Sequence, residues 1–508
     1  MKKEVLRMER ITYLEHGVTK LEDFNLNVFE GEILGFVPVN SHGREEFLRL
    51  LKENLSLYDG YVYYNEILVN SWKHSLQVNN RITVIQNESC LVDGLTVTDN
   101  IFVLRPKYGG EYIKSKVLQE QLKPFLEEID VDIEANSYVF KLSVFERVVV
   151  EILKGVILGH KLIVLNEIET MLTANELSKV LQIIKYYKSK GISFIYICLH
   201  MEDTAMLCDR VVLLMNGRIE KVLQHHELQI EKIESIFLDY ASMIRVHLEN
   251  KKEDARDRRE VCEMRYQFQK SKVPFRFQVH EGECLVIQCL DNEMYYEIRN
   301  AIVNQEMNDE SCVRMDNKRV QFRQNIEVGI IQEFASKTML FPHLSYMDNL
   351  CFNLSSRMSG VWFRRNIKRS IRMEFQNEIS EEVYKTPISE LTEKQKYQLV
   401  YKRILLQKPK VVFCVQPFQG ADLDHRMYIW TLLEGFLNKG IGVVILAVNL
   451  ADTLSIADRF VRVDDKNQQY EFVREEFASM PSFVPWQFLY KEQEQMQHVE
   501  MKNSDESN

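Results

Sequence analysis

The residues best suited to chemistry come directly after short apolar stretches. Asn166 and Glu167 follow Leu162–Leu165, and His200 follows Phe194–Leu199. A carboxylate, an amide and an imidazole can hold a metal ion or move protons when a fold brings them together. A histidine after a buried strand is, by itself, more often a structural residue. These positions therefore have to be interpreted together with the elements around them.

The chain repeats itself once at a nearly constant spacing. Asp209 and Asp458 lie in similar segments, and 458 minus 209 gives an offset of 249 residues. Small insertions separate the copies, because Glu30-Gly31-Glu32 matches Glu281-Gly282-Glu283 at an offset of 251. Two homologous domains follow from this repeat. The other matching pairs are Leu142-Ser143 with Leu391-Thr392, Lys161–Leu165 with Lys410–Cys414, and Lys190-Gly191-Ile192 with Lys439-Gly440-Ile441.

Each copy alternates apolar strands with helical segments, as in Leu162–Leu165, Glu176–Lys188 and Phe194–Leu199. This alternation predicts an α/β fold with a parallel sheet flanked by helices. We expect one domain over residues 1–223 and a second over 261–480. A polar linker over 224–260, in which the charges alternate in sign, should join them, and 481–508 should form a disordered polar tail.

Composition narrows the function classes. The chain has 508 residues, of which 45% are hydrophobic, so it can form large cores. Its net charge of −10 argues against nucleic acid as the partner. Nine scattered cysteines without metal-ligand spacing predict free thiols in a reducing compartment. No apolar signal segment or membrane helix is evident, so we expect a cytoplasmic protein whose membrane role is peripheral.

The order of these signals resembles the ATP-binding cassette domain. The order is a strand, loop and helix over Gly31–Leu51, then Gln86, then Leu142-Ser143-Val144 at the start of a helix, then Leu162–Glu167, then His200. The tandem length, with the segments Leu95–Ile101 and Ala457–Phe460, is similar to the double-cassette ATPase subunits of bacterial ribose, galactose and xylose importers. The resemblance extends to about residue 480.

This resemblance implies two P-loop NTPase-like domains, each with a helical subdomain. It implies ATP and Mg²⁺ as cofactors, membrane permease subunits as partners at the inner face of the cell membrane, and pairing of two chains as a homodimer. It also assigns roles to single residues. Tyr13 would stack on adenine, Gln86 would sense Mg²⁺ and the attacking water, Glu167 would be the catalytic base, and His200 would contact the terminal phosphate. Asn166 and Gln86 would be the metal ligands.

The phosphate-binding loop of that family would lie at Pro38–Glu46. Such a loop needs glycines, a lysine and a hydroxyl, because backbone N–H groups and a helix N-terminus must surround the phosphates. Asn40 and Gly43 match the family pattern, and Arg44 stands where the lysine would be. Glu45 and Glu46 replace the hydroxyls. Their carboxylates complement the helix dipole and oppose a bound phosphate.

The segments that would close over the nucleotide are altered in both copies. Ser143 and Thr392 match the serine of this segment and could bind phosphate or cap the following helix, but the glycines after them are absent. The second copy has Cys289–Glu297 as its loop, without a glycine or a basic residue. Val415-Gln416 replaces Asn166-Glu167, and Asn449 stands where His200 would be.

Three functions stay open at this stage. The first is a divergent importer subunit that docks on a permease, binds nucleotide weakly through its first domain and has no nucleotide site in the second. The second is a non-catalytic scaffold or regulator that does not itself drive transport. The third is a conventional ATP-hydrolysing importer subunit despite the altered motifs. A soluble cassette protein unrelated to transport is disfavoured, because such proteins usually keep intact phosphate loops.

Overall fold

The structure, a computed structural model, describes most residues between 3 and 477. The residues outside this description are 1–2, 16, 71–80, 87–88, 103–114, 200–203, 205–206, 228–254, 272, 305–306, 309, 317, 321–324, 358–362, 449–452, 454–455, 465 and 478–508. The predicted tail, most of the predicted linker, His200 and Asn449 therefore lie outside the described residues. The chain divides into two compact units, with the division between Asp239 and Tyr240.

The first unit is built on a six-stranded sheet that is parallel apart from one edge strand. Across the sheet the order is β10 (Arg218–Gln224), β9 (Arg210–Met215), β3 (Ile33–Pro38), β8 (Ser193–Ile197), β7 (Leu162–Asn166) and β6 (Ile82–Ile85). Strands β3 and β8 are buried at every position. Continuous apolar runs such as these are typical of strands that are covered on both faces.

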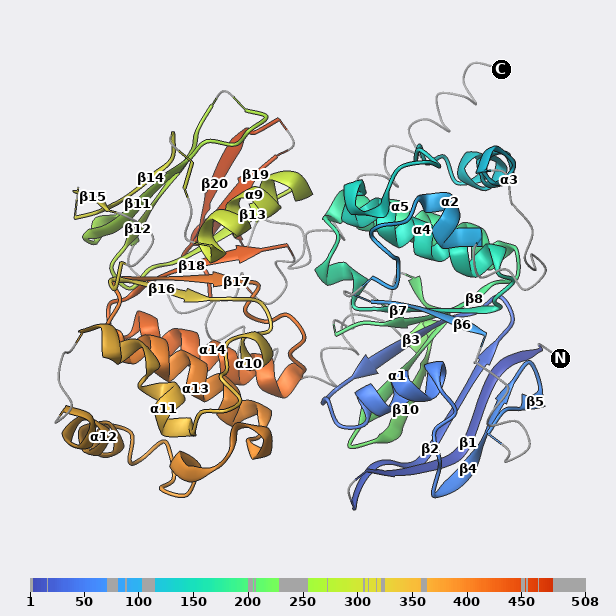
Figure 1. Cartoon of the computed structure of the whole chain (residues 1–508), viewed down its shortest axis with the longest axis horizontal. Coiled ribbons are helices and arrows are strands. Elements are labelled where there is room, and N and C mark those ends of the chain that lie inside the picture. Colours follow the sequence, from blue (N-terminus) through green and yellow to red (C-terminus); the bar gives the residue numbers. More distant parts are fainter. Residues whose placement is uncertain are drawn as a thin grey trace. The chain divides into compact units, whose positions relative to one another are not determined.

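Helices cover one face of this sheet, and a second sheet covers the other (Figure 1). Helices α4 (Val144–Ile157) and α5 (Ala174–Ser189) pack on the first face. Helix α1 (Arg44–Lys52) lies on the opposite face, together with the antiparallel sheet. The remaining elements are α2 (Val97–Phe102), α3 (Ser115–Glu128) and the antiparallel strands β2 (Val18–Phe29), β1 (Glu4–Glu15), β4 (Asp59–Tyr64) and β5 (Ile67–Leu68).

The second unit repeats this plan. Its sheet has the order β20 (Gln469–Val473), β19 (Arg459–Val463), β13 (Cys284–Cys289), β18 (Gly442–Ala447), β17 (Val411–Val415) and β16 (Val328–Ile331). Helices α13 (Glu393–Leu406) and α14 (Leu423–Leu437) cover one face, and α9 (Asn292–Val303) covers the other (Figure 1). The other elements are β12 (Phe275–His280), β11 (Glu260–Tyr266), β14 (Cys312–Met315), β15 (Lys318–Val320), α10 (Ala335–Thr338), α11 (Tyr346–Leu350), α12 (Phe363–Glu374) and α15 (Arg474–Phe477). The α/β fold class predicted from the sequence is confirmed.

The repeated sequence motifs form the same ion pair in both units. In the first unit, Arg210 Nε lies 2.5 Å from Glu32 Oε1. In the second, Arg459 Nε lies 2.7 Å from Glu283 Oε1, although without the alignment of a hydrogen bond. Both glutamates are buried, so each pair ties the turn before the first parallel strand to the neighbouring strand. This explains why Glu30-Gly31-Glu32 and the Asp-Arg dipeptides recur.

The aspartates of those dipeptides anchor the same strands. Asp209 Oδ2 accepts a hydrogen bond from the backbone N–H of Ile33 at 2.8 Å, and Asp458 Oδ2 accepts one from Cys284 at 2.9 Å. Ile33 and Cys284 begin the equivalent strands β3 and β13. A carboxylate therefore satisfies a buried backbone donor that the sheet leaves unpaired.

No described helix is long and apolar enough to span a membrane.

Glu32→Gln should destabilise the first unit by about 3 kcal/mol, because removing one partner leaves a buried guanidinium without its counter-charge. Glu283→Gln should cost less in the second unit, because Arg459 Nη1 also pairs with Glu471 Oε1 at 3.1 Å. The free energy of unfolding, measured by urea titration, tests both. The control is Glu22→Gln, which breaks the exposed pair with Arg218 and should change the stability far less. Equal effects of Glu32→Gln and Glu22→Gln would contradict the assigned role of the buried pairs.

Candidate functional site

Gly43 is required by packing inside the first unit. It begins α1 in the left-handed region, with φ of 84°. A Cβ atom at this position would lie 2.6 Å from the carbonyl oxygen of Lys20 and 3.0 Å from Cα of Gly217. No side chain fits between these groups. The glycine that matches a phosphate loop therefore has a structural reason to be there, whether or not a phosphate binds.

Other side chains of the loop 39–43 are held by the protein itself. Asn40 Nδ2 donates to Asn216 Oδ1 at 2.8 Å, and the backbone N–H of Asn216 donates to Asn40 Oδ1 at 3.1 Å. His42 Nε2 lies 2.9 Å from the carbonyl oxygen of Thr19. Asn40 thus fastens the loop to the turn between β9 and β10, and its predicted contact with nucleotide would require these bonds to break.

Arg44 and Glu167 form an ion pair at the centre of the predicted site. The guanidinium Nη1 contacts Glu167 Oε1, and the two side chains are 12% and 9% exposed. Arg44 is the first residue of α1, and Glu167 follows β7 in the left-handed region with φ of 54°. The fold brings together the predicted phosphate-binding cation and the predicted catalytic base, as expected. In this arrangement each neutralises the other.

The glutamates at the start of α1 lie in different environments. Glu45 is exposed, whereas Glu46 is buried, and Glu46 Oε1 lies 3.4 Å from Lys20 Nζ. Lys20 therefore supplies a counter-charge for a carboxylate that no solvent surrounds. The position where the family has a hydroxyl for Mg²⁺ thus holds a buried carboxylate that is paired with a partly exposed lysine.

The predicted metal ligands are partly committed to other partners. Lys52 Nζ donates to Gln86 Oε1 at 3.1 Å, so the oxygen that would bind Mg²⁺ already accepts from a cation. Asn166 Oδ1 is buried and accepts no hydrogen bond from the described part of the chain. Of the two predicted metal ligands, Gln86 and Asn166, only Asn166 has a side-chain oxygen without a hydrogen-bond donor among the described residues. Tyr13 belongs to the core beside α1 and is 8% exposed, so little of its ring is open for stacking.

Ser143 and Thr392 cap helices. Ser143 Oγ accepts from the backbone N–H of Glu146 at 3.2 Å, and Glu146 Oε2 accepts from the N–H of Ser143 at 2.7 Å. Thr392 and Gln395 make the same reciprocal pair at the start of α13. Capping, one of the two roles predicted for these residues, is therefore what the structure supports.

Sequence reasoning overlooked Glu169, which lies two residues after the predicted base. It is 2% exposed, and its Oε2 accepts from the hydroxyl of Tyr196 at 3.3 Å. Burial, followed by the charge of Glu167, raises the pKa of Glu169 to about 7. The repeat contained a signal for this residue: Glu169 is charged, whereas Phe418, its counterpart 249 residues later, is apolar.

The second unit has lost most of the loop. In the first unit β3 ends at Pro38 and α1 begins at Arg44, whereas β13 ends at Cys289 and α9 begins at Asn292. Five residues, 39–43, are thus reduced to two, 290–291. The loop can no longer be aligned at a single offset of 251 over Cys289–Glu297, because the helix is shifted by three residues. Asp291 Oδ1 accepts from the N–H of Met294 at 2.9 Å, so a carboxylate caps the helix where a phosphate would bind.

Side chains also connect the segments around the second site. Gln416 Nε2 donates to the hydroxyl of Tyr295 at 2.7 Å. Tyr295 donates in turn to Glu333 Oε1 at 3.2 Å, and Arg299 binds both oxygens of Glu333. This network joins α9, the residue after Gln332 and the position equivalent to Glu167. Burial, followed by the charge of Glu333, raises the pKa of Tyr295 well above its usual value.

Neither unit fits a magnesium-bound triphosphate. In the first, the guanidinium is paired, a buried carboxylate stands in the first helical turn and the loop side chains are fastened. In the second, the loop is too short and an aspartate caps the helix. We find no group of three or more histidine, cysteine or acidic side chains that could hold a metal ion among the described residues.

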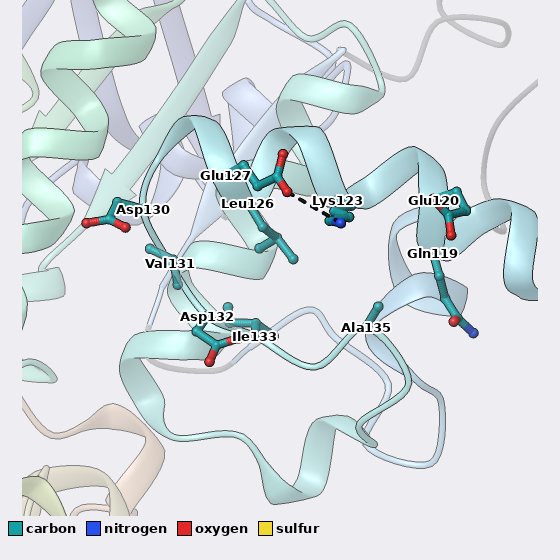
Figure 2. Close-up of a pocket in the computed structure, with 10 residues that line it drawn as sticks. All are labelled: Gln119, Glu120, Lys123, Leu126, Glu127, Asp130, Val131, Asp132, Ile133 and Ala135. Carbon is teal, nitrogen blue, oxygen red and sulfur yellow. Dashed lines mark ion pairs between the residues drawn. The ribbon is translucent and has the colours of Figure 1, made fainter.

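Two pockets in the described part of the chain are lined by none of the site residues predicted in the first unit. One pocket, of about 480 Å³, lies between α3 and the segment 130–135. Figure 2 shows the residues that line it, among them Lys123, which pairs with Glu127. Its other charged residues are acidic: Glu120, Asp130 and Asp132. A second pocket, of about 580 Å³, lies beside β16 in the second unit and includes Gln332, Phe341 and Phe352.

Glu169→Gln should flatten the pH dependence of stability. The folded protein keeps the Glu169 proton as pH rises from about 4.5 to about 7, whereas the unfolded chain loses it. The free energy of unfolding should therefore fall by about 3 kcal/mol across this window in the unmodified protein. Urea unfolding between these pH values measures the slope. Glu127→Gln, at an exposed carboxylate, should leave the slope unchanged. A slope that persists in Glu169→Gln would rule out Glu169 as its source.

Comparison with known proteins places these features in a family. Residues 21–169 match the family model described as ABC transporter. The galactose/methyl galactoside import ATP-binding protein MglA of Salmonella typhimurium is 24% identical over 90% of this chain and 92% of its own length. The ribose import ATP-binding protein RbsA of Clostridium tetani is 24% identical over 93% of this chain and 95% of its own. The solved structure of cbiO1 from Clostridium perfringens, part of the ABC transporter complex cbiONQ, is 16% identical, with a TM-score of 0.39 over 49% of this chain and 96% of that one. The resemblance read from the sequence is confirmed: residues 21–169 match an ABC transporter domain, and relatives of similar length are named as sugar import ATP-binding proteins.

Proposed function

We propose that this protein is a divergent subunit of a carbohydrate-type ABC importer that docks on a membrane permease. In this proposal nucleotide binding is weak at best in the first unit and absent in the second. Support for the transport role comes from relatives that match over nearly their whole length and are named for ribose or galactose import. The buried pair of Arg44 and Glu167 is the observation that carries the loss of nucleotide chemistry.

The size of the electrostatic terms favours impairment. A charge-assisted hydrogen bond is worth about 1.5 to 3 kcal/mol, which is roughly ten- to hundredfold in affinity. To bind a phosphate, Arg44 would first have to leave Glu167, and the released carboxylate would then repel the same anion. Glu46 adds a second buried carboxylate in the first turn of α1. These interactions weaken the binding of an anionic ligand, and the pairing with Arg44 makes Glu167 a poorer base.

An exposed apolar surface after Gln86 supports docking on a protein partner. Tyr138 and Phe140 stack with ring centroids 5.7 Å apart and are 45% and 58% exposed. Val92 and Leu95 are also exposed, and backbone hydrogen bonds from residues 139 and 140 hold their segment alongside. Val92 and Leu95 belong to Gln86–Phe102, the segment that in the resembled family lies beside the groove receiving the permease's cytoplasmic helices. Clustered exposed apolar side chains are typical of interaction sites.

The second unit has a comparable surface after Gln332. Phe341 and Phe352 stack at 4.2 Å between ring centroids and are 38% and 47% exposed. Both line the pocket of about 580 Å³, which also includes Gln332 and Arg403. Exposed apolar surfaces thus occur in both units, including the one whose loop is shortened, and this combination favours a subunit that binds its partner without turnover in that unit.

Two alternatives differ in their consequences for transport. A non-catalytic scaffold or regulator would keep both apolar surfaces but have no role in driving import. A conventional ATPase would require Arg44 and Glu167 to separate when nucleotide binds. We also propose, on the family resemblance alone, that the chain acts at the cytoplasmic face of the membrane and that two chains can pair as a homodimer.

Calorimetry with Mg-ATP should give no micromolar affinity, because binding has to break a buried ion pair. Phosphate release measured in parallel should be at background. Glu167→Gln should leave phosphate release at background but strengthen nucleotide binding, because it frees Arg44 and removes the opposing carboxylate. It should also destabilise the first unit without nucleotide, since it leaves Arg44 buried without a counter-charge. Micromolar binding together with turnover that disappears in Glu167→Gln would support the conventional ATPase and refute the impairment.

Phe140→Asp should reduce recovery of the chain with a permease encoded near its gene. Burial of one large apolar side chain contributes about 1.5 to 3 kcal/mol, so the loss should be at least about tenfold in affinity. Co-purification from membranes, followed by titration with the purified permease, measures this. The matched control is Tyr61→Asp, at an exposed aromatic residue on β4. If no permease co-purifies with the unmodified chain, the docking proposal fails and a regulatory role gains weight.

A further inference from the structure

Arg403 is a buried cation without an acidic partner among the described residues. It belongs to α13 and is 3% exposed. Its Nη2 donates to the carbonyl oxygen of Met339 at 2.6 Å, whereas its Nη1 has no hydrogen-bond partner in the described part of the chain. Burial lowers the pKa of Arg403 to about 10, so the guanidinium is still charged at neutral pH. A charge that is buried in this way is costly unless it is paired.

The first unit differs at the equivalent positions. An offset of 249 places Lys154 at the position of Arg403, and Glu151 at the position of Val400. In α4 a buried carboxylate therefore lies one turn before the lysine, whereas α13 has an apolar residue there. The unpaired charge of Arg403 is thus specific to the second unit and does not follow from the repeated fold.

Arg403 lines the pocket of about 580 Å³ beside β16. It is the one charged side chain among the described residues that form this lining, and most of the others are apolar. Phe341 lies over the guanidinium, with 5.6 Å between its ring centroid and Arg403 Cζ. A concave site of this size, with apolar walls and few polar groups, is typical of those that bind small molecules.

Two amide side chains of the pocket hold its wall together. Gln407 Nε2 donates to the carbonyl oxygens of Ile326 and Val328, both at 2.9 Å. Gln407 Oε1 accepts from Asn353 Nδ2 at 3.1 Å. These bonds fix the segment before β16 against the end of α13, so the pocket is formed before any ligand enters. Arg403 Nη1 is left as its charged donor.

We propose that this pocket binds a small organic carboxylate, with the carboxylate on Arg403 and the apolar body of the ligand against Phe341 and Phe352. A carboxylate supplies the counter-charge that Arg403 lacks, and its hydrogen bonds to a guanidinium are among the strong ones in proteins. A phosphate carries more charge than one guanidinium neutralises, and the apolar lining offers it few other donors. The pocket shares its aromatic residues with the proposed docking surface, but a small ligand needs no permease, so the two proposals can fail separately.

The test is calorimetric titration of the full chain with phenylacetate, which has one carboxylate and an apolar ring. It should bind with a Kd below about 1 mM, as expected for a ligand of this size that fits its site. The neutral phenylacetamide should bind at least about tenfold more weakly, because it cannot pair with the guanidinium. No binding of phenylacetate, equal binding of the amide, or tighter binding of inorganic phosphate would overturn the proposal.

Variants assign the binding to Arg403. Arg403→Gln should bind phenylacetate at least about tenfold more weakly, because the charged donor is lost. Phe352→Ala removes a ring that is 47% exposed, so it should fold normally and bind at least about threefold more weakly. Lys396→Gln, at a basic residue of α13 outside the pocket, is the matched control and should bind like the unmodified chain.

Two results would refute the assignment. One is unchanged binding of phenylacetate in Phe352→Ala and in a folded Arg403→Gln. The other is loss of permease recovery in Arg403→Gln when the unmodified chain binds no phenylacetate, which would assign Arg403 to an acidic side chain of the partner. Circular dichroism of each variant verifies that it is folded.

Discussion

The buried ion pair between Arg44 and Glu167 is the constraint on which the interpretation of the first unit depends. It joins the start of α1 to the end of β7, so it lies where the fold would place a phosphate and an attacking water. An ion pair with this little solvent is stable only while both partners are present. In the function proposed above, the contact that holds these two elements together also keeps Arg44 and Glu167 from acting on a nucleotide.

The second unit reaches a similar result by different chemistry. Tyr295, a residue of α9, donates toward Glu333 and accepts from Gln416, so neutral and charged groups together connect the segments around its site. Gln416 follows β17 with φ of 40°, a backbone conformation close to that of Glu167. The backbone geometry is thus similar in the two units, whereas the side chains differ, with the Arg44–Glu167 ion pair in the first and the Gln416–Tyr295 hydrogen bond in the second.

Much of the fold could be predicted from the sequence, because it depends on features that a sequence displays. Continuous apolar runs indicate parallel strands, and the repeat indicates two units with the same strand order. The altered loop of the first unit could also be recognised residue by residue. The pairing of Arg44 with Glu167 could not, because it depends on how two side chains far apart in the chain meet. Glu169 was missed for a related reason, since only burial distinguishes it from a surface carboxylate.

The different loop lengths have a consequence for how each unit could change in evolution. The first unit still has all five residues between β3 and α1, so point substitutions alone could recreate a glycine-rich loop there. The second unit has two, with a capping aspartate, and no exchange of side chains can supply the missing backbone N–H groups. Recovery there would require codons to be inserted. The two units thus differ in whether substitutions alone could produce a glycine-rich loop between the strand and the helix.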